Sequence, residues 1–377
     1  MVVARPHVGT AVLLALPLAC GARTGVEVTV TSSGPCSGSP LVPIAIPAPT
    51  VPKTPYATGT VLTVTTNAVY FTTGGGGSVG EPSEIARVAL LSGGAPDSSG
   101  PAIFPADFGG GPLVNDGVDL YFPSPHPGRT SFDVSPEVLA APLEGGAPLD
   151  LPPVDNTAFA FYVVDLFTNR QRGVFFAWNG GPADSGPFKG AVDHWNGVET
   201  QVLASFPDGV GEIVVDTDDA FAETASSLYA VPLPEGPPVK LRPLAVAAQL
   251  FGLNADALFF APDLTSIVRR DRATGVETVL VEDAALLPEI GQGHTGWVDS
   301  SWVYYVTGSE GNPNALFRVG IDGGTPEAIW TDPNHPPSGA VATDACNIYW
   351  LTSTYSSSAP GGSSGNGPSI LMVRTKQ

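Results

Sequence analysis

Two histidines and two carboxylates are the residues of this chain best suited to chemistry. His294 and His335 each come just before the inner strand of neighbouring repeat units, so their side chains could meet near a central channel. Together with Asp332 or Glu310 they could hold a divalent cation, because imidazole and carboxylate groups are suitable metal ligands. Their spacing matches no recognised metal signature, which favours the alternative that they are solvated loop residues. We predict no other cofactor.

Further side chains suited to recognition lie in long stretches between predicted strands. The ligand-binding candidates among them are His126, Arg129, Trp178, Glu310 and Tyr355. Long loops on one face of a rigid scaffold are the expected place for binding. In an alternative interpretation the protein is a hydrolase or lyase that acts on an extracellular polymer. His126, His294 and His335 would then be its acid–base or metal residues.

Several short motifs are matched by chance in a chain that contains 45 glycines. The pattern G-x-S-x-G occurs at Gly76 to Gly80 and at Gly361 to Gly365, and G-x-G-x-x-G occurs twice. A nucleophile elbow needs a strand before it and a helix after it, and a phosphate cradle must open a helix. These matches lie in loops rich in Gly and Ser, so we assign no catalytic residue to them.

The elements that position the candidates follow from a repeated phrase. An Asp or Asn is followed five positions later by an aromatic residue that opens a strand-like run. The pairs are Asp116 and Tyr121, Asp216 and Phe221, Asn254 and Phe259, Asp299 and Tyr304, and Asp344 and Tyr349. A repeat of roughly 40 to 50 residues indicates a β-propeller. We predict an all-β, seven-bladed propeller with four-stranded antiparallel blades, with six or eight blades and a β-sandwich plus a second β domain as alternatives.

The repeated aspartates allow two interpretations. As a ring on one face they could form a cation site along the axis. As turn residues each would cap its own turn by accepting backbone N–H bonds. Because turn chemistry recurs with the fold, repetition in nearly every unit favours capping.

Loop lengths separate the two faces of the predicted disc. The Asp/Asn turns and the Gly-Gly hairpins are short and belong to one face. The long connections belong to the other face. They run from Thr73 to Ser83, Pro123 to Pro136, Asn179 to Phe188 and Ser353 to Pro368 within units, and from Asp97 to Gly111, Asp283 to Gly296 and Asp332 to Ser338 between units.

The first 55 residues are a targeting segment and a linker. A basic start and the apolar run Val8 to Ala19 predict a signal peptide over residues 1–19. Cys20 follows Leu-Ala as in a bacterial lipobox, which predicts lipidation there. The alternative is ordinary cleavage near Ala19. Residues 20–55 would be a linker rich in Ser, Pro and Thr, and residues 56–377 the propeller. Gly21 follows Cys20 at the position where an Asp marks retention in the inner membrane of related bacterial lipoproteins. This favours the outer membrane, if the envelope has one.

The seventh unit lacks a fourth strand, and the run Leu41 to Ile46 has no unit of its own. We therefore predict that this run closes the ring, since closure removes exposed sheet edges. Closure would bring Cys36 near Cys346, and a disulfide between them would tie the two ends together. Two unpaired buried thiols are the alternative.

Composition narrows the partners. The formal net charge is −20, from 36 acidic and 16 basic residues, and so acidic a surface repels nucleic acid. No mature segment has the ~20 uninterrupted apolar residues that a membrane span needs. With 43% hydrophobic residues the chain can build a large core, and with 39 prolines it has few windows for a helix.

The repeats resemble secreted propellers of the YWTD, NHL and Tol types. The residues that carry the resemblance are Asp344 with Tyr349-Trp350-Leu351-Thr352, Asp299 with Tyr304-Tyr305-Val306-Thr307, and the strands at Arg87-Val88 and Arg318-Val319. Such families mostly bind proteins, peptides or glycans, and some members are enzymes. The resemblance implies the architecture more specifically than the activity. Together with the lipobox at Cys20, it leads us to predict a monomeric, lipid-anchored envelope protein that acts as a binding or scaffold module for a protein, peptide or glycan.

Overall fold

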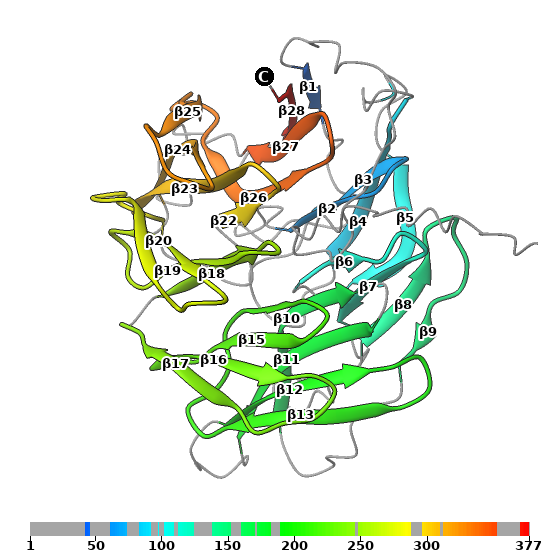
Figure 1. The fold of residues 1–377 in the computed structure, drawn as a ribbon. Helices are drawn as coiled ribbons and strands as arrows, with labels where there is room; N and C mark the ends of the chain where they lie inside the picture. The colour runs from blue at the N-terminus through cyan, green and yellow to red at the C-terminus, as the bar shows by residue number, and fades with distance from the viewer. Residues whose placement is uncertain are drawn as a thin grey trace, which may run out of the picture.

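Seven four-stranded antiparallel sheets surround a central axis and form a β-propeller (Figure 1). The computed structural model describes residues 42–45, 61–73, 83–91, 97, 102–108, 112–123, 138–151, 160–169, 172–181, 189–245, 248–287, 296–309, 312–352 and 370–376. In these ranges every regular element is a strand. The prediction of a seven-bladed, all-β propeller is confirmed.

Each blade runs from an inner strand at the axis to an outer strand at the rim. Blade 1 contains β2 (Leu62–Val64), β3 (Ala68–Thr73), β4 (Ser83–Ala89) and β5 (Ala102–Phe108). Blade 2 contains β6 (Val114–Asn115), β7 (Asp119–Pro123), β8 (Val138–Pro142) and β9 (Leu149–Asp150). Blade 3 contains β10 (Ala160–Asn169), β11 (Gly173–Gly181), β12 (Lys189–Trp195) and β13 (Thr200–Phe206).

The next three blades repeat this order. Blade 4 contains β14 (Ile213–Val215), β15 (Asp219–Glu223), β16 (Ser227–Pro232) and β17 (Val239–Pro243). Blade 5 contains β18 (Gln249–Leu253), β19 (Ala257–Ala261), β20 (Ile267–Asp271) and β21 (Glu277–Val281). Blade 6 contains β22 (Gly296–Val298), β23 (Trp302–Ser309), β24 (Asn312–Gly320) and β25 (Glu327–Trp330).

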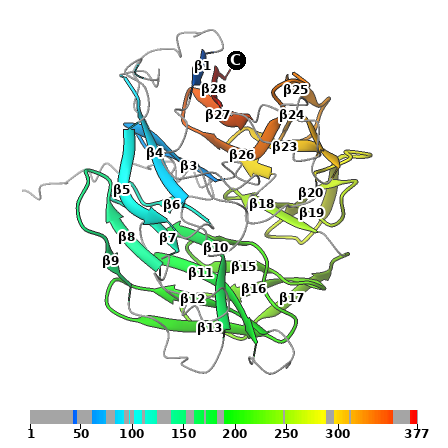
Figure 2. The same cartoon turned by 180° about the vertical axis from the view of Figure 1, so that it is seen from behind.

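Blade 7 joins the two ends of the chain. It contains β26 (Pro337–Thr343), β27 (Asn347–Thr352), β28 (Ile370–Thr375) and, as its outer strand, β1 (Val42–Ala45). Strand β1 pairs antiparallel with β28, with Val42 opposite Val373 and Ala45 opposite Ile370. Both views of the molecule place β1 beside β28 near the C-terminus (Figures 1 and 2). The predicted ring closure by an N-terminal strand is confirmed.

The inner strands form a complete circle of contacts. Going round the axis, β2, β6, β10, β14, β18, β22 and β26 each contact the next, and β26 contacts β2. One predicted connection needs correction, because residues 97–111 are not a plain connection between units. They contain β5, the outer strand of blade 1.

The core fills the seams, by which we mean the packing layers between neighbouring blades. Strand β27 shows why the sequence folds this way, since all six of its residues are buried. Tyr349 and Leu351 pack toward blade 1, while Ile348 and Trp350 pack toward blade 6. A strand buried on both faces reads as an unbroken apolar run, which explains the aromatic strands in each repeat.

Candidate functional site

The short-turn face consists of the turns between the first and second strands of each blade and, in blades 1 to 6, of the connections between the third and fourth strands. Its repeated aspartates cap their own turns. In each case Oδ1 accepts backbone N–H bonds from the residues two and three positions on, at 2.7–3.0 Å. The capping residues are Asp116, Asp216, Asn254, Asp299 and Asp344. The capping interpretation is confirmed, because these oxygens are occupied by the turn itself.

The aromatic residue of the phrase completes the turn in three blades. The hydroxyl of Tyr121 donates to Asp116 Oδ2 at 2.9 Å, and Tyr304 and Tyr349 make the same bond to their own aspartates at 2.9 and 2.6 Å. Burial, and then the neighbouring carboxylate, raises the pKa of all three tyrosines far above the usual value. Each hydroxyl therefore stays protonated and acts as a donor.

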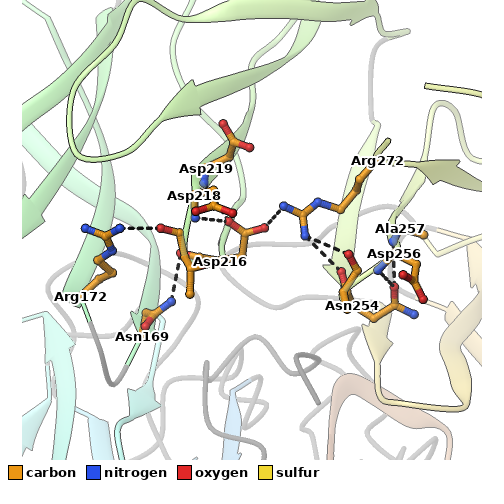
Figure 3. Close-up of polar contacts among 11 residues, drawn as sticks. Asn169, Arg172, Asp216, Asp218, Asp219, Asn254, Asp256, Ala257 and Arg272 are labelled. Atoms are coloured by element: carbon orange, nitrogen blue, oxygen red, sulfur yellow. Dashed lines mark hydrogen bonds and ion pairs between the residues drawn. The ribbon is translucent and has the colours of Figure 1, made fainter. Parts of the chain in front are cut away.

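In blade 4, the second oxygen of the capping aspartate is bound by a residue from blade 5. Phe221 has no hydroxyl, and Arg272 from the β20–β21 hairpin forms an ion pair with Asp216 Oδ2 instead (Figure 3). The guanidinium carbon lies 5.6 Å from the centre of the Phe221 ring, which is a cation–π contact. Its Nη1 also donates to the carbonyl of Ala255 at 3.2 Å.

Two side chains of blade 3 donate hydrogen bonds to the same turn from the other side. Asn169 Nδ2 donates to the backbone carbonyl of Asp216 at 3.0 Å, and Arg172 Nη2 donates to that of Thr217 at 2.8 Å (Figure 3). The polar side chains around this turn therefore bind neighbouring blades to one another, and the short-turn face is mainly structural here.

The opposite face, which we call the long-connection face, is uneven around the ring. Connections between the second and third strands are long in four consecutive blades, at residues 353–369 of blade 7, 74–82 of blade 1, 124–137 of blade 2 and 182–188 of blade 3. They are short in the other three blades, at residues 224–226, 262–266 and 310–311. Among the connections within blades, the long ones thus belong to blades 7, 1, 2 and 3, and among those between blades, residues 282–295 form a long connection from blade 5 to blade 6.

Asp332 and His335 form the best-defined polar element of this face, in the turn between β25 and β26. His335 Nδ1 lies 2.9 Å from Asp332 Oδ2, and Asp332 Oδ1 accepts the backbone N–H of Asn334 at 2.8 Å. Trp330 Nε1 donates to the His335 carbonyl at 2.7 Å and holds the turn against blade 6. The hydrogen bond from His335 lowers the pKa of the Asp332 carboxyl. The side chains are 37% and 32% exposed for His335 and Asp332, so solvent reaches both.

This geometry gives Asp332 and His335 different roles from those expected as two equal metal ligands. The carboxylate holds one nitrogen of the imidazole, and within the described ranges the structure shows no hydrogen bond to His335 Nε2. A carboxylate often orients a histidine in this way when the other ring nitrogen binds a metal or acts as a general base. Among the described residues, no three His, Cys, Asp or Glu side chains lie together as a metal site.

The structure places one further candidate inside the molecule. Trp178 is 8% exposed and lies in the seam between blades 2 and 3, where its Nε1 donates to Asp193 Oδ2 at 2.8 Å. It lies at the end of β11 that leads into the 182–188 connection, but its ring is part of the core. Five other candidates, His126, Arg129, His294, Glu310 and Tyr355, lie outside the described residues.

Of the three cysteines, the structure describes Cys346. Cys346 is disulfide-bonded and lies in the turn that Asp344 caps. Its expected partner Cys36 lies outside the described residues, as does Cys20, so the Cys36–Cys346 pairing and lipidation stay predictions. No helix long and apolar enough to cross a membrane occurs in the described ranges.

Sequence reasoning missed Arg272 and Asp193. Arg272 is one of many charges on a hairpin, and nothing near it in the chain indicates that it faces blade 4. Asp193 interrupts the apolar run of β12, and a lone acid in a strand that is buried on both faces is the signal that could have indicated it.

Comparison with known protein families and with curated protein sequences found no match. Solved structures of similar fold include an oligogalacturonate lyase in complex with manganese. It is 10% identical with a TM-score of 0.52, over 90% of this chain and 98% of that one. An acylaminoacyl peptidase of Pyrococcus horikoshii is 12% identical with a TM-score of 0.53, over 85% of this chain and 52% of that one. At such identity the likeness shows the propeller fold alone.

Proposed function

We propose that this protein is an exported propeller that binds a protein, peptide or glycan of the cell envelope through its long-connection face. The observation that carries the proposal is the length of the connections on this face, above all of those between the second and third strands of blades 7, 1, 2 and 3. The short-turn face offers less for recognition, because its aspartates cap turns and its arginines bind neighbouring blades. Lipidation of Cys20 would tether the disc to the membrane, most naturally the outer membrane, with residues 21–41 as the spacer.

Site-specific photo-crosslinking in intact cells tests this proposal. A crosslinking amino acid is placed at Tyr355 in the blade 7 connection, and in a matched variant at Val198, which is 84% exposed on a short-turn hairpin. We expect one defined envelope product from the Tyr355 position and none from Val198. Equal capture from both positions, or no capture from either, would contradict a recognition role for the long-connection face.

A second candidate function is hydrolysis or elimination on an extracellular polymer. The observation that favours it is the Asp332–His335 pair, whose orientation suits a proton-transferring or metal-binding histidine. Two solved structures of similar fold are enzymes, one of them a lyase with manganese, which is in keeping with this alternative. If a divalent cation binds, His335 Nε2 would be its ligand from this turn and Asp332 would orient the ring.

Turnover measurements separate the two functions. The purified protein is incubated with a panel of polysaccharides, polyuronides and esters, with Mn²⁺ and with EDTA. If the protein is an enzyme, His335→Gln loses activity while Asn334→Ala, in the same turn, keeps it. Absence of turnover on the whole panel, together with a defined crosslinked partner, would exclude the enzymatic alternative.

A further inference from the structure

A single buried acid lies in the seam between blades 2 and 3. Asp193 is fully buried on β12, and its neighbours two residues away on either side, Ala191 and Trp195, belong to the apolar cluster of that seam. Because side chains two apart share a face of a strand, Asp193 points toward blade 2. Residues of blade 2 in the same cluster include Val138 and Ala140 of β8.

The hydrogen bonds of this acid are incomplete. Trp178 Nε1 donates to Oδ2 at 2.8 Å, whereas Oδ1 is buried and has no hydrogen-bond partner among the described residues. The indole N–H of Trp195, on the same face of β12, is also buried and unpaired within the described ranges. An ionised carboxylate with one donor in an apolar seam is costly, whereas the neutral acid is much less so.

No described charge compensates the acid, because its pKa is shifted by burial and by the Trp178 hydrogen bond and by no neighbouring charge. The elements packed against it present apolar side chains from β8, β10 and β11, and the titratable group that they contribute to the cluster is Tyr121 of β7. The hydroxyl of Tyr121 is bonded to Asp116 and stays protonated. Burial raises the pKa of Asp193 to about 7, and the Trp178 hydrogen bond opposes this only in part.

Three connections of the long-connection face begin or end, along the chain, at strands of this seam. Residues 124–137 lead directly into β8, residues 152–159 lead into β10, and residues 182–188 follow β11. We propose that Asp193 is a proton-operated latch. It holds the seam between blades 2 and 3 closed while it is neutral, and it loosens the packing of β8, β10, β11 and β12 in this seam when it ionises. This proposal does not depend on which ligand the face binds.

The direction of the pH effect follows from linkage. The ordinary pKa of an aspartate is 3.8 and the folded-state pKa of Asp193 is about 7, so the folded protein binds more protons between these values. The contribution of Asp193 to stability is therefore fully present below about pH 4 and is lost as the pH rises through 7. Above that pH it changes no further.

Asp193→Asn tests the latch, because the amide keeps the shape and the acceptor for Trp178 but cannot ionise. Denaturant midpoints are measured from pH 5 to 8 for the wild type, for Asp193→Asn, and for Asp150→Asn, which removes an exposed aspartate of β9 in blade 2. As the pH rises from 5 to 8, we expect the denaturant midpoints of the wild type and of Asp150→Asn to fall relative to the midpoint of Asp193→Asn. Amide exchange in β11 and β12, corrected for intrinsic rates, should accelerate at pH 8 in the wild type and not in Asp193→Asn.

A second measurement needs no folded variant at position 193. The indole N–H resonance of Trp178, assigned by its loss in Trp178→Phe, is followed in the wild type across pH 5 to 9. We expect a step in its shift with a midpoint near pH 7, as its acceptor ionises. A constant Trp178 shift over this range, or an equal loss of stability with pH in Asp193→Asn and the wild type, would overturn the proposal.

Discussion

Replacement of Arg272 by methionine should show how much the ion pair with Asp216, which takes the place of a tyrosine hydrogen bond in blade 4, contributes to stability. Asp216 is 3% exposed, and its Oδ1 keeps two backbone N–H bonds at 2.7 and 2.8 Å in the variant. Its Oδ2 loses the charged partner that Arg272 supplies from the neighbouring blade. The methionine retains much of the apolar stem that covers Phe221, so the change isolates the charge and the donors.

The magnitude follows from burial. Removal of one partner from a buried ion pair costs about 3–5 kcal/mol, because the other charge is left uncompensated. The side chain of Arg272 is 21% exposed, so water partly screens the original pair, and the carboxylate left behind keeps its two backbone donors. We therefore expect a loss of about 2 kcal/mol in the free energy of unfolding, since the local dielectric is higher than in a deep core.

A second substitution turns this into a test of the repeated phrase. Phe221→Tyr in the Arg272→Met background would place a hydroxyl where Tyr121, Tyr304 and Tyr349 donate to their aspartates. A hydrogen bond to a charged acceptor contributes about 1.5–3 kcal/mol, so the double variant should recover about 1–2 kcal/mol. Phe221→Tyr alone should change the free energy of unfolding little, because Arg272 already pairs with Asp216 in that variant.

Denaturant unfolding at pH 7 of the wild type, the two single variants and the double variant gives the coupling energy of this cycle. Arg270→Met, on the same hairpin, is the matched control. Its ion pair with Glu277 at 3.0 Å is at the surface, and its loss should cost no more than about 1 kcal/mol. A double variant no more stable than Arg272→Met would refute the idea that arginine and tyrosine are interchangeable partners of this aspartate.

Three shorter predictions concern other features that should stabilise the propeller: a hydrogen bond, a disulfide and a glycine. Tyr349→Phe removes a 2.6 Å bond to the buried Asp344 and should cost about 1–3 kcal/mol in chemical unfolding, whereas loss of less than 0.5 kcal/mol, on the order of experimental error, would argue that the bond adds nothing. Cys346→Ala, or treatment with a reductant, should lower the unfolding midpoint by the equivalent of about 2–5 kcal/mol, and an unchanged midpoint in reductant would show that the disulfide does not stabilise the ring. Gly173→Ala should cost roughly 3 kcal/mol or more, since φ is 109° there and a Cβ would overlap the Trp195 carbonyl; a soluble variant with the wild-type melting temperature would contradict this.

The parts of the fold that the sequence predicted are those in which cause and effect lie close along the chain. Asp344, its capped turn and Tyr349 lie within six residues, so the phrase itself contains the hydrogen-bond pattern. The closing strand was predictable for another reason. Leu41 to Ile46 is a β-like run without a unit, and the seventh unit lacks a strand, so one pairing satisfies both.

The parts that escaped prediction depend on which blade face a residue meets. Both faces of β11 and β12 are buried, so alternation of residue types does not distinguish surface from seam, and Trp178 reads as an accessible aromatic. Arg272 and Asp216 are joined across two blades, and no local pattern links a hairpin to a turn in the preceding unit. The candidate site was less predictable than the fold, because the described candidates outside the Asp332–His335 turn are set by packing between blades, as Trp178 is.

The pairing of β1 with β28 also governs the order in which the molecule can assemble. Residues 42–45 leave the ribosome long before residues 370–373, so β1 cannot pair until almost the whole chain has been made. Once β28 has formed, its open edge can pair with the N-terminal strand of another copy in place of the strand from its own chain. We therefore expect exchange of this strand between molecules to be the characteristic misassembly at high concentration, and the isolated dimer to contain two complete rings.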